Sequence, residues 1–219
     1  MIVAAGRGDR LGADRPKAFA RLRGRPLLAE SLERLEDSDW IDAIVVAAPP
    51  DWEEPAILLA EELGAGKVTA CVTGGSTRVE SVRAGVAEVP EEAAVLVVHD
   101  AARPLLPEAV LERVLAPLSD GWDGAVPALP VADTIKRVRG HEVVETLPRD
   151  ELAAVQTPQA FVAPVLRSAL LASRPLSPDC ASLVEANGGR VRIVEGDRRL
   201  LKVTGPEDLE LVESWLADE

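Results

Sequence analysis

Short apolar runs, rich in β-branched residues, alternate with longer segments of helical periodicity along most of this chain. Residues 2–4, 43–48, 67–72 and 94–98 are the expected strands of its first half. Parallel strands need long crossover connections, and these are usually helices that cover the faces of the sheet. The alternation therefore predicts an α/β fold of Rossmann-like type, in which a mostly parallel sheet is flanked by helices.

The intervening and later segments carry helix signals. Helices are expected at residues 26–35, 51–64, 79–86, 164–173 and 179–186, and further strands at residues 190–194 and 200–203. Thr204 and Glu207 have the spacing of a capping box, which predicts a C-terminal helix that begins there. Together these elements fit a single domain over residues 1–219.

Residues 131–150 interrupt this rhythm. Two short runs, residues 131–137 and 142–146, flank the turn Arg139-Gly140-His141, a pattern typical of a β-hairpin. The runs mix charged side chains with apolar ones, so they are poor material for the core of a monomer. We expect a projecting β-arm that pairs with another subunit.

The charge balance excludes some classes of partner. The chain has 24 Lys and Arg against 37 Asp and Glu, a formal charge of −13, whereas nucleic acids and anionic membranes require a basic surface. No run approaches the ~20 apolar residues that cross a bilayer, so a cytoplasmic protein without membrane or nucleic-acid partners is expected. Cys71 and Cys180 are too few for a disulfide framework, and His99 and His141 cannot form a multi-histidine metal site.

A glycine-rich loop directly follows the first expected strand. Glycines such as Gly6 and Gly8 let backbone N–H groups approach phosphate oxygens closely, although they also suit a plain tight turn. Leu11 occupies the third glycine position of the dinucleotide fingerprint, which argues against that motif. The first 25 residues have a formal charge of +5 and the rest −18. A cationic loop in an acidic chain favours phosphate binding, because the local field decides association.

Three further places carry candidate chemistry. Asp100 ends a buried strand, where it could hold Mg²⁺ against substrate phosphates or simply pair with Arg103, while His99 beside it is expected to be a hydrogen-bonded core residue. Gly74-Gly75, with Ser81 after them, permit close approach of a flat base; the alternative is a turn into a helix capped by Ser76. Lys202 lies in an apolar run and should meet an anion, either a structural carboxylate or a substrate phosphate.

Together these segments resemble the methylerythritol-phosphate cytidylyltransferase family of the non-mevalonate isoprenoid pathway. The matching pieces occur in the family's order and span nearly the whole chain: Ala4-Ala5-Gly6-x-Gly8-x-Arg10-Leu11, Pro16-Lys17, Gly74-Gly75-x-x-Arg78-x-x-Ser81-Val82, His99-Asp100-Ala101-Ala102-Arg103-Pro104, Asp133-Thr134-Ile135-Lys136, Thr157-Pro158-Gln159 and Lys202-Val203-Thr204-x-Pro206-Glu207-Asp208-Leu209.

The resemblance implies a nucleotidyltransferase domain that makes a CDP-alcohol and pyrophosphate from CTP and 2-C-methyl-D-erythritol 4-phosphate, with Mg²⁺ as cofactor. It implies that the phosphates and the transition state are stabilised by Arg10, Lys17 and Lys202, and that Asp100 is the metal ligand. The nucleotide would be bound by Ala4, Ala5, Gly6, Gly8, Gly75, Ser81 and Ala101. The acceptor would be bound by Arg103 and Lys202, and by Thr134 and Arg149 from the arm of a partner subunit.

The chain departs from the family pattern near the acceptor. Pro178 stands where the family commonly has Thr, and Ser76 replaces a frequent Asp. Two other functions therefore stay open: transfer of the same CMP group to ribitol 5-phosphate, and a non-catalytic dimeric regulator that keeps the nucleotide pocket. The retained Lys17, Asp100 and Lys202 argue against the regulator.

Overall fold

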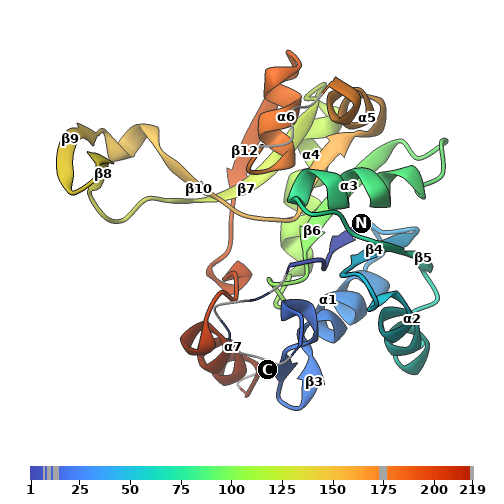
Figure 1. The fold of residues 1–219 in the computed structure, drawn as a ribbon. Helices are drawn as coiled ribbons and strands as arrows, with labels where there is room; N and C mark the ends of the chain where they lie inside the picture. The colour runs from blue at the N-terminus through green and yellow to red at the C-terminus, as the bar shows by residue number, and fades with distance from the viewer. Residues whose placement is uncertain (7, 9–10, 12–14, 173–176, 218–219) are drawn as a thin grey trace.

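One central sheet organises the chain in the computed structural model, which describes residues 1–6, 8, 11, 15–172 and 177–217. Its strands follow the order β10-β7-β11-β6-β1-β4-β5, and β12 pairs with β7 (Figure 1). Their bounds are β1 Ile2–Val3, β4 Ile44–Ala48, β5 Val68–Thr73, β6 Val95–Asp100, β7 Gly124–Pro130, β10 Ala153–Val155, β11 Gln159–Val162 and β12 Val191–Glu195. Only β10 and β11 run against the direction of the other strands of this sheet, which confirms the mostly parallel α/β prediction.

Helices cover both faces of this sheet. Their bounds are α1 Leu27–Glu36, α2 Glu53–Glu62, α3 Arg78–Ala87, α4 Glu108–Ser119, α5 Ala163–Ala172, α6 Cys180–Ala186 and α7 Pro206–Ala217. One buried cluster joins α1, α2 and α4 to the sheet, and a second joins α3, α5 and α6. Neighbouring strand residues such as Ala160 and Phe161 belong to different clusters, because successive side chains of a strand point to opposite faces. No helix in the described part of the chain is both long and apolar enough to cross a membrane.

Several local expectations were wrong or incomplete. Residues 200–203 do not form a strand: a 3-10 turn, Arg198–Leu200, leads into a loop whose Val203 N–H donates to the Ala102 carbonyl at 2.8 Å. This loop is apolar because it packs between the turn after β6 and α7. The elements α4, β7, β10 and β11 were not predicted from the sequence.

Two helix caps differ from the expected ones. Thr77, not Ser76, caps α3, in a capping box with Glu80. At α7 the Asp208 carboxylate, rather than that of Glu207, accepts hydrogen bonds from the Thr204 and Gly205 N–H groups. The helix starts at Pro206, so the third helical position falls one residue later than expected.

Cys71 lies in β5, as expected, but it is only half-buried because β5 is an edge strand of the sheet. Cys180 is buried at the start of α6.

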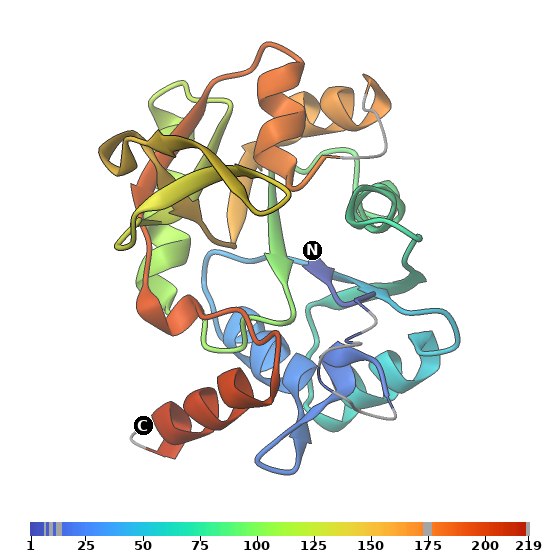
Figure 2. The ribbon, with the colours of Figure 1, turned by 60° about the vertical axis from the view of Figure 1, so that its left-hand side comes forward.

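The expected β-arm is present. Strands β8 (Ile135–Arg139) and β9 (Glu142–Leu147) form a separate antiparallel pair. Figures 1 and 2 show this hairpin projecting from the body of the molecule. Val138, Val143 and Val144 are each more than half exposed on it. Such valines leave apolar surface open on the hairpin, and pairing of the arm with a second copy stays a prediction.

Candidate functional site

A cavity of about 470 Å³ opens at the carboxyl ends of the parallel strands β1, β4, β5 and β6. Carboxyl ends of parallel strands meet at one edge of the sheet, which is where open α/β sheets bind ligands. Most of the predicted site residues line this cavity: Ala4, Ala5, Gly6, Lys17, Gly75, Ser81, Asp100, Ala101 and Lys202. Segments almost 200 residues apart therefore contribute to one site.

The glycine loop after β1 folds back onto Lys17. The Lys17 N–H donates to the Gly6 carbonyl at 3.2 Å. Gly8 has a φ of +76°, and a Cβ added there would lie 2.9 Å from the Lys17 Cβ. Gly8 is not among the lining residues; instead it lets the loop close against the lysine that lines the cavity. The predicted residue Arg10 lies outside the described residues.

Paired glycines after β5 bring the start of α3 close to the loop after β1. A Cβ on Gly74 would collide with the Ala5 side chain, and one on Gly75 would collide with Glu80. The Ser81 hydroxyl accepts from the Gly75 N–H at 3.1 Å and donates to the Thr77 carbonyl at 3.0 Å. The result is a wall of backbone and small side chains, which suits close approach of a flat group.

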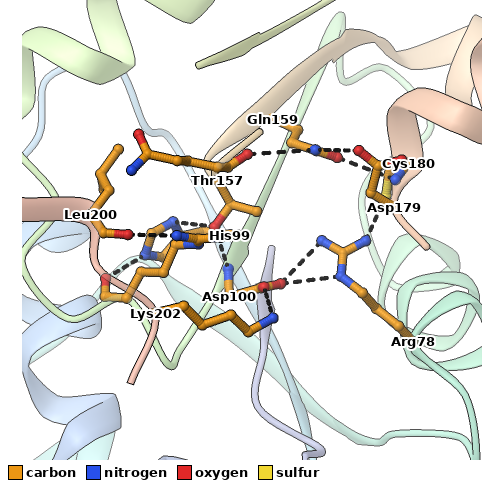
Figure 3. A network of polar contacts seen from close by, with 11 residues as sticks. Arg78, His99, Asp100, Thr157, Gln159, Asp179, Cys180, Leu200 and Lys202 are labelled. Atoms are coloured by element: carbon orange, nitrogen blue, oxygen red, sulfur yellow. Dashed lines mark hydrogen bonds and ion pairs between the residues drawn. The ribbon is translucent and has the colours of Figure 1, made fainter. Parts of the chain in front are cut away.

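Asp100 is the centre of a polar network shown in Figure 3. Its Oδ1 accepts from Arg78 Nη2 at 3.0 Å and from Arg78 Nε at 3.1 Å, and its Oδ2 accepts from Lys202 Nζ at 2.7 Å. Burial by itself would raise the pKa of Asp100, but Arg78 and then Lys202 hold that pKa well below its usual range. The carboxylate is therefore ionised and carries a positive side chain on each oxygen.

Arg78 belongs to the family motif Gly74-Gly75-x-x-Arg78-x-x-Ser81-Val82, but no role was predicted for it from the sequence. It lies in the first turn of α3, three positions before Ser81, and its Nη1 also donates to Cys180 Sγ at 3.4 Å. Burial by itself would lower the pKa of Arg78, but the contacts with Asp100 and Cys180 together raise the pKa of the guanidinium above its ordinary value. The sequence signal that could have found it is an arginine at the start of a helix, shortly after the Gly74-Gly75 pair.

Lys202 was expected to meet an anion, and the anion that it contacts is the carboxylate of Asp100. The lysine side chain is 41% exposed, so its ammonium also faces the open cavity. The alternative pairing of Asp100 with Arg103 was wrong: Arg103 Nη1 donates to the Leu200 carbonyl at 2.5 Å instead. His99 is fully buried and hydrogen-bonded, as expected of a core histidine.

The described residues offer little to a metal ion by themselves. They contain no cluster of three or more His, Cys, Asp or Glu side chains that could hold one. Asp100 is the one carboxylate among the lining residues in the described part of the chain. Mg²⁺ is commonly bound by one or two carboxylates together with substrate phosphates and water. The site thus fits a magnesium ion that brings most of its ligands with a polyphosphate.

Of the residues expected to bind the acceptor, Lys202 lines this cavity, whereas Arg103, Thr134 and Arg149 do not. Arg103 is turned toward Leu200, and Thr134 and Arg149 are exposed at the base of the arm. Arg149 Nη1 donates to the Ala132 carbonyl at 2.9 Å, within the same arm. A single chain therefore does not bring Thr134 or Arg149 to the site.

Cationic side chains surround this cavity, and backbone atoms together with small side chains form its wall. Lys17, Arg78 and Lys202 line it, and Arg78 and Lys202 are paired with Asp100. The Ser81 hydroxyl is committed to two hydrogen bonds, and the His99 ring is buried away from solvent. Positive charge around a phosphorus centre stabilises the transition state of phosphoryl and nucleotidyl transfer. The arrangement suits transfer between two bound ligands more than attack by a protein nucleophile.

Comparison with known proteins agrees with this chemistry. The family model described as 2-C-methyl-D-erythritol 4-phosphate cytidylyltransferase matches residues 1–218. Relatives of that description from Frankia casuarinae and Nocardia farcinica are each 44% identical, over 218 and 217 residues; they cover 99% of this chain and 80% and 92% of their own lengths. The crystal structure of the protein so named from Thermus thermophilus is 33% identical, with a TM-score of 0.79 over 99% of this chain and 98% of its own. The chain belongs to the 2-C-methyl-D-erythritol 4-phosphate cytidylyltransferase family.

Proposed function

We propose that this chain transfers the CMP group of CTP to 2-C-methyl-D-erythritol 4-phosphate and releases pyrophosphate. The observation that carries this function is the meeting of Lys17, Asp100 and Lys202 at one backbone-walled cavity. Family membership supports the same reaction. The product is 4-diphosphocytidyl-2-C-methyl-D-erythritol, which makes the chain a CTP-dependent nucleotidyltransferase.

The reaction is an in-line displacement at the α-phosphorus of CTP. An oxygen of the acceptor phosphate forms a bond to that phosphorus while the bond to the bridging oxygen breaks, and the electron pair leaves with pyrophosphate. The nucleophile is already anionic near neutral pH, so no side chain has to remove a proton. Lys17, Lys202 and Arg10 stabilise the negative charge of the transition state and of the leaving group.

The nucleoside end binds against the small residues of the cavity. Ala4, Ala5, Gly75 and Ser81 surround the cytosine, while Gly6 and Ala101 lie at the ribose. These positions have little or no side chain, so the backbone can approach a planar ring. Gly8 acts at the triphosphate end, where its close packing on Lys17 supports that ammonium.

Asp100 is the residue we assign to Mg²⁺. A bound magnesium ion supplies positive charge that neutralises phosphate oxygens. The assignment rests on the ionised carboxylate of Asp100 at the cavity wall. Asp100 would hold the ion, and the hydrogen bonds from Arg78 to its Oδ1 would help to orient the carboxylate.

The acceptor is held across a homodimer. Arg103 lies beside the acceptor phosphate, and Thr134 and Arg149 from the arm of the other subunit complete its binding. The exposed valines of the arm support this role, because pairing with a second copy would cover them. Pro178 cannot offer the hydroxyl that the family commonly has there, so the polyol contact comes from other groups.

We place the reaction in the cytoplasm, without nucleic-acid or membrane partners.

Pyrophosphate release tests this function directly. The purified chain is given CTP and Mg²⁺ with either 2-C-methyl-D-erythritol 4-phosphate or ribitol 5-phosphate. Release that is at least tenfold faster with the first acceptor is expected. Equal or faster release with ribitol 5-phosphate would reassign the acceptor. Tight CTP binding with no release on either acceptor would point to the regulator instead.

A further inference from the structure

His99 bridges two ends of the turn that carries Asp100. Its ring is fully buried, with Nε2 3.0 Å from the Arg103 carbonyl oxygen and Nδ1 3.3 Å from the Thr157 hydroxyl. The same hydroxyl oxygen accepts the main-chain N–H of Asp100 at 3.0 Å. Figure 3 shows the imidazole and Thr157 next to Asp100.

Only one assignment of hydrogen-bond donors and acceptors fits all the contacts of His99 and Thr157. A carbonyl oxygen only accepts, so Nε2 of His99 must carry the hydrogen that goes to Arg103. Nδ1 is then unprotonated and accepts the Thr157 hydroxyl hydrogen, which leaves the lone pairs of that hydroxyl for the Asp100 N–H. This pattern requires a neutral imidazole in a defined tautomer.

The turn held in this way also positions the segment that carries Lys202. The Ala102 carbonyl accepts the Val203 N–H at 2.8 Å, and Arg103 Nη1 donates to the Leu200 carbonyl at 2.5 Å. Lys202 lies between these two anchor points and reaches Asp100 Oδ2. A shift of the turn would therefore displace Asp100 and Lys202 together.

We propose that His99 and Thr157 are positioning residues for the transfer reaction. Through the Asp100 N–H and the Arg103 carbonyl they hold the turn that sets both the carboxylate and the docked Lys202 segment. Neither residue lines the cavity in the described part of the chain, so both act through others. The proposal rests on the proposed function, because the reaction is what the positioning serves.

Substitution of Thr157 separates positioning from simple packing. Thr157→Val keeps the shape but removes the hydroxyl, whereas Thr157→Ser keeps the hydroxyl. We expect kcat per folded molecule to fall at least tenfold in Thr157→Val, with KM for CTP changed less than about threefold. Thr157→Ser should stay within about threefold of the parent kcat. Thr69→Val, an exposed position on the edge strand β5, is the matched control and should keep the parent kcat.

The outcomes distinguish a positioning role of Thr157 from a role in packing alone. A Thr157→Val protein with parent kcat, or a Thr157→Ser protein as slow as Thr157→Val, would overturn the proposal. If Thr157→Val does not fold, nitrogen-15 correlation spectra of the parent imidazoles still test it. The His99 signals must show the neutral, Nε2-protonated tautomer at pH 7, with exposed His141 as the internal reference; the other tautomer or a charged ring would refute it. A parent that does not turn over CTP refutes the proposed function, and the spectra then judge the hydrogen-bond assignment separately.

Discussion

Arg78 holds Asp100 with two nitrogens on one oxygen: Nη2 and Nε lie 3.0 and 3.1 Å from Oδ1. The two residues are 22 positions apart, one in the first turn of α3 and one at the end of β6. Their contact joins the glycine wall that follows β5 to the turn that follows β6. It also leaves Oδ2 of the carboxylate for Lys202.

Arg78→Ala should destabilise the fold, since it leaves Asp100 buried with one cation instead of two. Loss of a partner from a largely buried ion pair costs about 2–4 kcal/mol. Urea unfolding followed by circular dichroism measures this loss. The control is Arg137→Ala on the arm, where the pair with Glu145 is at least half exposed and should contribute less than about 1 kcal/mol. Equal effects of the two substitutions would contradict the assigned role of Arg78.

Gly8→Ala should slow the reaction because the new Cβ would push against the Lys17 Cβ. We expect kcat/KM for CTP to fall at least tenfold, measured by pyrophosphate release. Gly24→Ala is the matched control: Gly24 has a φ of +84° but open space where a Cβ would be. Both variants carry similar backbone strain, about 1 kcal/mol, so they should lose similar stability. Only the variant at position 8 should lose activity, and a similar loss in both would trace the effect to strain alone.

Lys17→Ala should abolish CTP turnover while the fold persists. Removal of one group that stabilises transition-state charge costs about 100-fold or more in rate. Lys67→Ala should behave in the opposite way, because Lys67 Nζ donates to the Glu36 and Ser38 carbonyls far from the cavity. It should lower the melting temperature and keep the turnover number. Retained activity in Lys17→Ala would remove this lysine from the mechanism.

Mixing two inactive variants tests the arm. If Arg149 serves the site of the partner subunit, a heterodimer of Lys17→Ala and Arg149→Ala chains contains one complete site. Subunits exchanged at random should then recover about a quarter of the parent activity. Each variant alone stays inactive or nearly so with the natural acceptor. No recovery after proven subunit exchange would place Arg149 in its own subunit's site or outside the site.

Features that depend on short stretches of chain could be predicted from the amino-acid sequence alone. Periodicity indicated the parallel strands, and the glycines at positions 6, 8, 74 and 75 marked where backbone must approach closely. The expectation that Lys17, Ser81 and Asp100 share one site came from the family resemblance; they meet because the parallel strands share a carboxyl edge. The hairpin at the arm followed from its own turn and its mixed strands.

Features that depend on contacts between distant segments could not be predicted in this way and are visible only in the folded chain. The run at 200–203 has the composition of a strand, but its Val203 N–H is taken by the Ala102 carbonyl, so it becomes a docked loop. Strand β11 was missed because its four residues carry little periodicity; pairing between β6 and β7 defines it. The partners of Asp100 likewise come from α3 and from a segment 102 residues later. Local propensity cannot choose such partners, since the free energy that selects them comes from burial of the whole sheet.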